Sequence, residues 1–423
     1  MSERNRELLN LTVVGVLTGL GFASVYIARQ SEISTGSLSY AGFFFLLYLV
    51  AHTVARLTVP YADPYLLPIA ALLTAVGVTE IYRLDPGDAF RQGLWIVIGV
   101  GVFSLALIAL RRDYRILESY KYLFGLGAIL LLALPALPGV GKTVNGARLW
   151  VNAGPLSFQP GELAKLALIV FLAGYLREKR EVIAQGRLKD FGPLLVIWGG
   201  CMLVLVETND LGSGLLYFGV FLAMLYAATA RALYVWIGAA LFVAGSYGVY
   251  HISPHVRDRV QVWLHAFKYA QSDGYQLVQA RYSIAHGEFG GTGLGKGVFT
   301  TPGSEHPLIP FLNTDFIYSA IAQELGLIGA AALLLVYMLF VARGFRVSLL
   351  AQDGFSKLLC VGLAFTFALQ TFIIVGGIVG LIPLTGITLP FVSYGGSSVV
   401  ANFLVLAGLL LASNRANARR GEA

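Results

Sequence analysis

The chain has 423 residues, of which 57% are hydrophobic and only 13% are charged. A soluble domain carries roughly 25% charged residues, so this composition excludes an ordinary soluble protein and indicates a polytopic membrane protein. The net charge of +7 would suit a nucleic-acid partner, but the positions of the basic residues give it another explanation.

Apolar runs of about the ~20 residues that cross a bilayer recur along the whole chain. We expect twelve transmembrane helices, with Ala230 and Arg231 dividing one long apolar stretch into two of them. An even number of spans puts both termini on the same side of the membrane. The predicted spans are residues 9–28, 38–58, 64–83, 92–110, 120–138, 159–176, 192–207, 210–229, 232–252, 315–342, 356–382 and 396–413.

Lys and Arg residues are divided unevenly between the two sets of short loops. One set holds only Arg29, Arg83, Arg91, Lys142 and Arg148, whereas the two chain ends and the alternate loops hold most of the others. Short cytoplasmic loops carry the excess of positive charge, so both termini are expected in the cytoplasm. The net charge is then a signal of topology, and we expect no nucleic-acid partner.

One extracytoplasmic loop, residues 253–314, is much longer than the rest. An apolar stripe through Val256, Val260 and Trp263 predicts a helix lying on the membrane surface, and residues 274–287 predict a second helix. The glycine-rich stretch GEFGGTGLGKG (287–297) lacks the strand and helix that flank a nucleotide-binding loop. Its backbone N–H groups could still bind a phosphate. We predict no metal-ligand set in this loop, whose histidines do not share a regular helix.

Two carboxylates stand at the entry to a later apolar run, in PFLNTDFIYSAIAQELG (310–326). Acids in a membrane span are costly unless they face protein, water or a ligand, so Asp315 and Glu324 are expected to have roles. On a continuous helix they would lie ~13.5 Å apart along the axis. We expect Asp315 near the outer face, meeting a substrate, and Glu324 nearer the midplane, holding the bundle together.

Three further residues carry charge at unusual positions. Arg148 lies in an outer loop against the prevailing charge bias, where it could contact a lipid headgroup or bind an anionic ligand. Glu162 and Lys165 are spaced i, i+3 in an apolar helix and can pair on one face. Inside a membrane such a pair is usually structural or functional.

The stretch GLIPLTGITLPFVSYGGSSVV (380–400) combines glycine, proline and serine at membrane depth. Irregular backbone survives there only when it is buried in protein or lines a watery cavity, so we expect it to line one. Its small residues could equally serve a helix–helix contact.

Taken together, six ordered stretches resemble the SEDS family (shape, elongation, division and sporulation) of cell-wall polymerases. They are GARLW (146–150), FQPGELAKLALI (158–169), DLGSG (210–214), GYQLVQARYSIAHGEFGGTGLGKG (274–297), NTDFIYSAIAQELG (313–326) and PLTGITLPFVSYGGSS (383–398). The resemblance covers about residue 64 to residue 413. It implies an all-α ten-helix core at 61–423 and makes residues 1–60 a two-helix N-terminal extension.

The resemblance implies a peptidoglycan glycosyltransferase that polymerises lipid II at the outer face of the bacterial cytoplasmic membrane, for cell elongation or division. In that reaction the 4-hydroxyl of an acceptor sugar attacks the anomeric carbon of a donor that carries a polyprenyl diphosphate. A base for the hydroxyl and positive charge for the diphosphate are the main requirements. A class B penicillin-binding protein is the implied partner, and a divalent cation, Mg²⁺ or Mn²⁺, could share the diphosphate charge.

The resemblance also implies roles for individual residues. Asp315 matches the essential aspartate of the family and is expected to be the general base. Arg148 is the expected diphosphate ligand, because a guanidinium suits phosphate oxygens. The remaining assignments are substrate contacts for Glu162, Lys165, Gln159, Thr314, Ser393 and Ser397, and structural acids in Glu324 and Asp210.

Two other functions would also use a polar cavity in a membrane bundle. A transporter of lipid-linked precursors would move its substrate without making glycan. A non-catalytic scaffold for a penicillin-binding protein would tolerate the loss of Asp315. The gathering of polar residues on the predicted outer face favours catalysis over alternating access.

Overall fold

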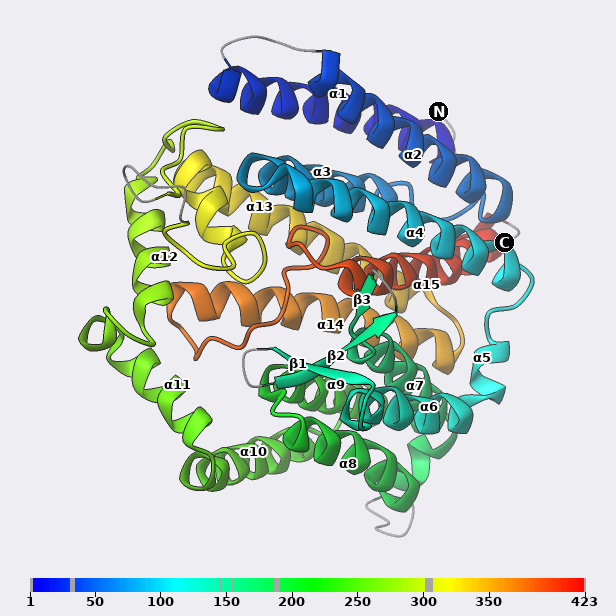
Figure 1. Cartoon of the computed structure of the whole chain (residues 1–423). Coiled ribbons are helices and arrows are strands. Elements are labelled where there is room, and N and C mark those ends of the chain that lie inside the picture. The colour runs from blue at the N-terminus through cyan, green and yellow to red at the C-terminus, as the bar shows by residue number, and fades with distance from the viewer. Residues whose placement is uncertain are drawn as a thin grey trace.

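The structure, a computed structural model, describes residues 3–30, 35–144, 147–153, 156–185, 191–300 and 307–421. Most of these residues belong to long apolar helices that run side by side through the molecule (Figure 1). Helices satisfy their own backbone polar groups, which is what a bilayer demands of a spanning segment. The chain is an all-α polytopic membrane protein, as predicted, with one small sheet at the side of the bundle.

In the described residues, twelve helices overlap the twelve predicted spans. In the described part of the chain, nine are long and apolar enough to cross a membrane, while α6 and α8 are shorter apolar helices. The exact number of spans therefore stays a prediction. The twelve are α1 (Glu3–Gln30), α2 (Thr35–Thr58), α3 (Leu66–Leu84), α4 (Pro86–Leu110), α6 (Lys121–Ala133), α7 (Gly161–Ala184), α8 (Gly192–Glu207), α9 (Leu211–Thr229), α10 (Ala232–Ile252), α13 (Ile317–Leu350), α14 (Gly354–Val379) and α15 (Gly396–Gly421).

The two chain ends lie at the same end of the bundle (Figure 1). Near the N-terminus, Arg4 donates a hydrogen bond to the carbonyl oxygen of Ala62. Near the C-terminus, the Asn417 side chain donates to the neighbouring Tyr61 carbonyl at 2.9 Å. The short helix α5 (Ile116–Ser119) is drawn at this end too.

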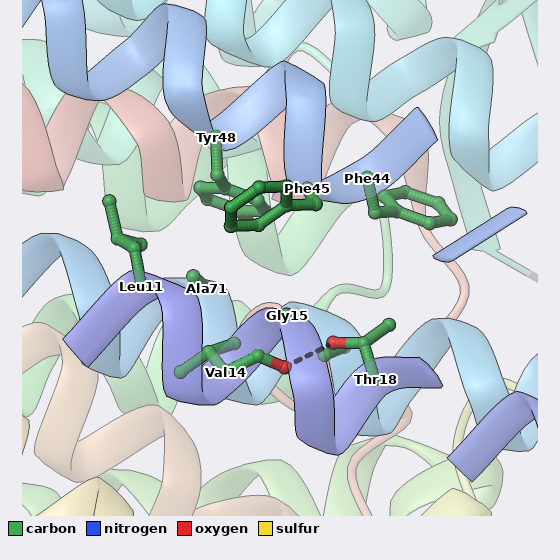
Figure 2. Close-up of a pocket in the computed structure, with 9 residues that line it drawn as sticks. Leu11, Val14, Gly15, Thr18, Phe44, Phe45, Tyr48 and Ala71 are labelled. Atoms are coloured by element: carbon green, nitrogen blue, oxygen red, sulfur yellow. Dashed lines mark hydrogen bonds between the residues drawn. The ribbon is translucent and has the colours of Figure 1, made fainter. Parts of the chain in front are cut away.

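The first two helices form one edge of the bundle and pack on α3 and α4 (Figure 1). Figure 2 shows a small apolar pocket among α1, α2 and α3, where Leu11 and Val14 face Phe44 and Tyr48. At the end of α1, the buried Glu7 carboxylate pairs with Arg4 at 2.5 Å and with His52 at 2.6 Å. These charged contacts join α1 to α2, and the extension packs on the rest of the bundle through α3 and α4.

A three-stranded antiparallel sheet occupies the predicted outer loop that contains Arg148. Its order is β1 (Gly141–Val144), β2 (Ala147–Ala153) and β3 (Leu156–Phe158). This sheet was not predicted, because its strands are far shorter than the apolar runs that identify membrane spans. It follows the 3₁₀ turn η1 (Leu134–Ala136).

The long outer loop contains the two predicted helices, α11 (Pro254–Leu264) and α12 (Tyr275–His286), joined through the 3₁₀ turn η3 (Ala266–Tyr269). They lie across the end of the bundle opposite the chain termini (Figure 1). Residues 301–306 of this loop lie outside the described residues.

The helix predicted at 315–342 needs correction. It begins only at Ile317, so Asp315 stands in the turn before it, and it is broken at Gly326, whose φ is +66° and ψ is −170°. Glycine tolerates this conformation, and the loop packs against it: the Leu327 N–H donates to the Glu288 carbonyl at 3.0 Å. The helical rise expected between Asp315 and Glu324 therefore applies only from Ile317 onward, and the break lies beyond Glu324.

The glycine-rich loop also meets the N-terminal extension, at Gly295. This residue has a φ of +84°, and a Cβ on it would lie 2.6 Å from the Cβ of Ala28 in α1. We expect Gly295→Ala to destabilise the protein by about 1–3 kcal/mol through overpacking and left-handed strain. Thermal unfolding of the purified protein measures the loss.

Gly290→Ala is the matched control, since a Cβ there meets nothing within 4 Å. Equal unfolding temperatures for the two variants would show that α1 and this loop are not in the close contact described.

Candidate active site

Asp315 stands in a tight turn between the outer loop and α13. Phe311 opens the turn with a φ of +58°, and its carbonyl accepts hydrogen bonds from the N–H groups of Thr314 at 3.1 Å and Asp315 at 3.2 Å. The turn leaves the Asp315 carboxylate partly buried at the end of the bundle. The side chain is thus held outside the membrane-spanning helix, where a polar substrate group could reach it.

The irregular segment 381–395 returns into the bundle and forms one wall of the site. A Cβ on Gly386, whose φ is +73°, would lie 3.7 Å from the Asp315 Oδ2. Two residues earlier, the Leu384 carbonyl accepts a hydrogen bond from the Arg259 Nη1 of α11 at 3.1 Å. The start of α9 touches the same segment, since a Cβ on Gly212 would be 2.7 Å from the Thr385 carbonyl oxygen. Three distant parts of the chain therefore meet at residues 384–386.

The electrostatics of this meeting point favour a base that titrates near neutrality. Burial raises the pKa of Asp315 to about 6, against a smaller lowering by the positive charge of Arg259. Burial also lowers the pKa of Arg259 from its ordinary high value. Asp315 is therefore mostly ionised at pH 7 and close enough to its pKa to exchange a proton.

Asp210 begins α9 and is held as a helix cap. Its carboxylate accepts a hydrogen bond from the Ser213 N–H at 3.0 Å, as an N-cap aspartate should. Burial raises its pKa, and the bond from Ser213 lowers it by less. This is the placement expected of a structural acid.

Glu162 and Lys165 pair as the spacing predicted, with their Oε2 and Nζ atoms 2.5 Å apart. The same Nζ donates to the Gln370 Oε1 of α14 at 2.9 Å. Gln370 in turn donates to the Thr388 carbonyl at 2.8 Å. One chain of polar contacts thus joins α7 and α14 to the irregular segment.

Gln370 is a site residue that the sequence reasoning did not assign. It sits within a long apolar run, and a single glutamine there gives no signal of its partner. Only the packing of α14 against α7 brings it to Lys165.

Two serine hydroxyls anchor the end of the irregular segment, through bonds to Thr314 and Gln159. The buried Ser393 hydroxyl donates to the Thr314 carbonyl at 2.5 Å and accepts from the Leu389 N–H at 3.0 Å. The Ser397 hydroxyl accepts from the Gln159 N–H at 2.8 Å. Both serine hydroxyls are buried and already engaged with the backbone, whereas the Thr314 side chain is more accessible.

Arg148 lies on β2, opposite Thr143 of β1. Its Nη2 donates to the Leu137 carbonyl at 2.9 Å, and its N–H donates to the Thr208 carbonyl at 3.4 Å. Among the described residues, no hydrogen bond or ion pair joins Arg148 to Asp315.

Glu324 is fully buried and binds the glycine-rich loop. Its carboxylate accepts N–H bonds from Gly295 at 2.6 Å and Gly297 at 3.0 Å, and it pairs with Arg83 at 3.2 Å. The loop N–H groups that the sequence left open for a phosphate thus bind the protein's own carboxylate. The arrangement ties α3, α13 and the loop together.

The described residues contain no group of three or more His, Cys, Asp or Glu side chains placed to hold a metal ion. Asp315 and Asp210 both act electrostatically on Arg259. Two carboxylates near a cation do not form the ligand set of a resident metal ion.

The family model for FtsW, RodA and SpoVE, described as "Cell cycle protein", matches residues 65–419. The chain is 40% identical over 436 aligned residues to the peptidoglycan glycosyltransferase RodA of Mycobacterium tuberculosis (strain ATCC 25618 / H37Rv). That match covers 98% of this chain and 91% of the relative.

Two solved structures share the fold. One, described as "Structural coordination of polymerization and crosslinking by a peptidoglycan synthase complex", has a TM-score of 0.71 and 29% identity over 84% of this chain and 98% of that chain. The crystal structure of the Thermus thermophilus rod shape determining protein RodA gives a TM-score of 0.60 and 27% identity, over 84% and 97%. The family model matches most of the chain, and the relatives are similar over nearly its whole length, which confirms the resemblance. The chain belongs to the FtsW, RodA and SpoVE family.

Proposed function

We propose that this peptidoglycan glycosyltransferase polymerises lipid II, with Asp315 as its general base. The observation that carries the proposal is the placement of a carboxylate of raised pKa beside Gly386, in a turn at the end of the bundle. A base with a pKa near the working pH combines ionisation with effective proton transfer.

The step that the site supports is a displacement at the anomeric carbon of the donor. Asp315 accepts the proton of the acceptor 4-hydroxyl as its oxygen bonds to that carbon. The bond from the carbon to the diphosphate oxygen breaks, and its electron pair leaves with the diphosphate. A divalent cation such as Mg²⁺ or Mn²⁺ would enter with the diphosphate oxygens as part of the substrate complex.

The irregular segment is fixed on one side by the polar contacts of Glu162, Lys165 and Gln370. Lys165 keeps Gln370 oriented, and Gln370 holds the Thr388 carbonyl two residues beyond Gly386. We assign them to shaping the cavity that receives substrate. We also assign substrate contacts to Thr314 and Gln159, which bond the serines that anchor this segment, and to Arg148 on β2.

We place the protein in the bacterial cytoplasmic membrane with both termini in the cytoplasm. The excess of Lys and Arg in one set of loops supports this, as does the position of both chain ends at one end of the bundle. A class B penicillin-binding protein is the proposed partner, and elongation or division is the proposed process. The related structure of a peptidoglycan synthase complex supports the choice of partner.

Asp315→Asn keeps the shape of the side chain and removes the base. We expect it to lower polymerisation of labelled lipid II by at least ~100-fold, the usual contribution of a general base. The assay uses the purified protein, alone and with its cognate penicillin-binding protein. Asp258→Asn, a change of an exposed aspartate on α11, should leave the rate unaltered. Equal rates for wild type and Asp315→Asn would refute the assignment.

The pH profile tests the same carboxylate without a mutation. Only ionised Asp315 can accept a proton, so kcat/KM should fall as pH drops through about 6. Each pH unit further below that value should reduce the ionised fraction about tenfold. A rate unchanged between pH 7 and pH 5, in protein that remains folded, would mean that no carboxylate with this pKa limits the reaction.

Lys165→Met would leave the Glu162 carboxylate without its cation in the bundle. We expect a loss of about 3–5 kcal/mol in unfolding free energy, as when one partner of a buried pair is removed. The double variant Lys165→Met with Glu162→Gln should recover most of it, because no uncompensated charge remains. A single variant as stable as wild type in chemical or thermal unfolding would contradict the role of this pair.

A further inference from the structure

Arg259 is a second charged residue at the meeting point of residues 384–386. It lies on α11, one helical turn before Trp263, so both side chains extend from one face of that helix. Arg259 donates to the Leu384 carbonyl at 3.1 Å, and the Trp263 Nε1 donates to the Gly380 carbonyl at 2.8 Å. The two bonds fix α11 against the irregular segment and hold the guanidinium over the site.

The positive charge of Arg259 is not neutralised by an ion pair in the described part of the chain. No described carboxylate oxygen lies within 4.0 Å of the Arg259 guanidinium nitrogens. Its electrostatic partners are Asp315 and Asp210, which act on it from beyond contact. A guanidinium has several N–H donors, and one bond to Leu384 leaves others for a ligand. A partly buried cation with free donors and no ion-pair partner is a suitable binding site for an anion.

We propose that Arg259 binds the diphosphate of the lipid-linked donor and receives the negative charge that develops on it as it leaves. This inference rests on the proposed function and adds to its site the cation that binds the leaving diphosphate. A guanidinium can bond two phosphate oxygens at once, which a lysine ammonium does not match.

The spacing of Arg259 and Asp315 suits this division of labour. In an in-line displacement, the attacking and departing oxygens stand on opposite sides of the reacting carbon. The base and the cation should then face each other across the sugar without touching. Asp315 lies by Gly386 and Arg259 by Leu384, on one segment but beyond ion-pair distance.

Two other outer arginines are less suited to the role. Arg148 is bound to the Leu137 carbonyl on β2 and shares no contact with the 384–386 segment among the described residues. Arg257, on the same helix as Arg259, is exposed and donates to the His251 carbonyl at 3.0 Å. Arg257 therefore provides a matched control: it has the same charge, two residues away, with no place in the site.

Binding of geranylgeranyl diphosphate to the full chain in lipid nanodiscs tests the inference directly. Arg259→Gln should raise its Kd about 10- to 100-fold, the usual effect of losing hydrogen bonds to a charged group. Arg259→Lys should give an intermediate Kd, and Arg257→Gln should bind as wild type does. Geranylgeraniol, which lacks the diphosphate, should bind equally to all four proteins. Asp315→Asn should still bind the diphosphate.

Unchanged diphosphate binding by Arg259→Gln, equal weakening by Arg257→Gln, or no binding to wild type would each overturn the inference. Arg259→Lys covers the case in which Arg259→Gln does not fold. Polymerisation of lipid II by the same preparations separates the two proposals. If wild type binds the diphosphate through Arg259 and makes no glycan, the proposed function fails and the anion site stands. If glycan forms with unaltered KM in Arg259→Gln, only this inference fails.

Discussion

The structure depends on satisfying the polar backbone of an irregular segment that lies inside a membrane bundle. Residues 381–395 form neither a regular helix nor a strand, and only a few turn bonds, such as that from the Ser393 N–H to the Leu389 carbonyl, are internal. Neighbouring helices must therefore supply most of the partners. Gln370 bonds the Thr388 carbonyl, the Tyr337 hydroxyl bonds the Pro390 carbonyl at 2.6 Å, and the Gln92 side chain bonds the Ser393 carbonyl at 3.2 Å. These bonds fix the segment, and the segment positions Gly386 beside Asp315.

A second constraint concerns two carboxylates, Asp315 just before the start of α13 and Glu324 just before its break at Gly326. Glu324 is enclosed by loop N–H groups and Arg83, so its charge is compensated within the protein. Asp315 has no such enclosure, and burial without a close cation raises its pKa. The same sequence stretch therefore contains one acid bound by the protein's own donors and one, Asp315, that we propose for proton transfer. Arg259 completes the contrast as a cation without an ion pair.

Much of this arrangement could be predicted from the sequence, because helix spacing is local. The i, i+3 spacing of Glu162 and Lys165 predicted their contact, and Ala230 ends α9 with a left-handed φ of +54° where the sequence suggested a division. The helices α11 and α12 followed from an apolar stripe and a helical run. The cost of an acid at a membrane span directed attention to Asp315, and the family resemblance added the role of general base.

The remaining features depend on contacts between distant parts of the chain. The break at Gly326 depends on the glycine-rich loop that packs against it, and a glycine in the sequence does not by itself predict a break. In the sequence, Arg259 is one charged residue beside the apolar stripe of α11, and only the folded structure brings it to the Leu384 carbonyl. Arg148 was the more conspicuous arginine, yet the sheet that binds it could not be predicted from runs of hydropathy.

The most direct test of the account is the structure of the protein, by electron microscopy, with a non-reactive lipid II analogue and an acceptor strand bound. The account predicts the acceptor 4-hydroxyl within hydrogen-bond reach of the Asp315 carboxylate, about 2.6–3.2 Å, and the diphosphate on the opposite side of the anomeric carbon. An acceptor bound elsewhere in the bundle, with Asp315 facing only protein, would contradict it.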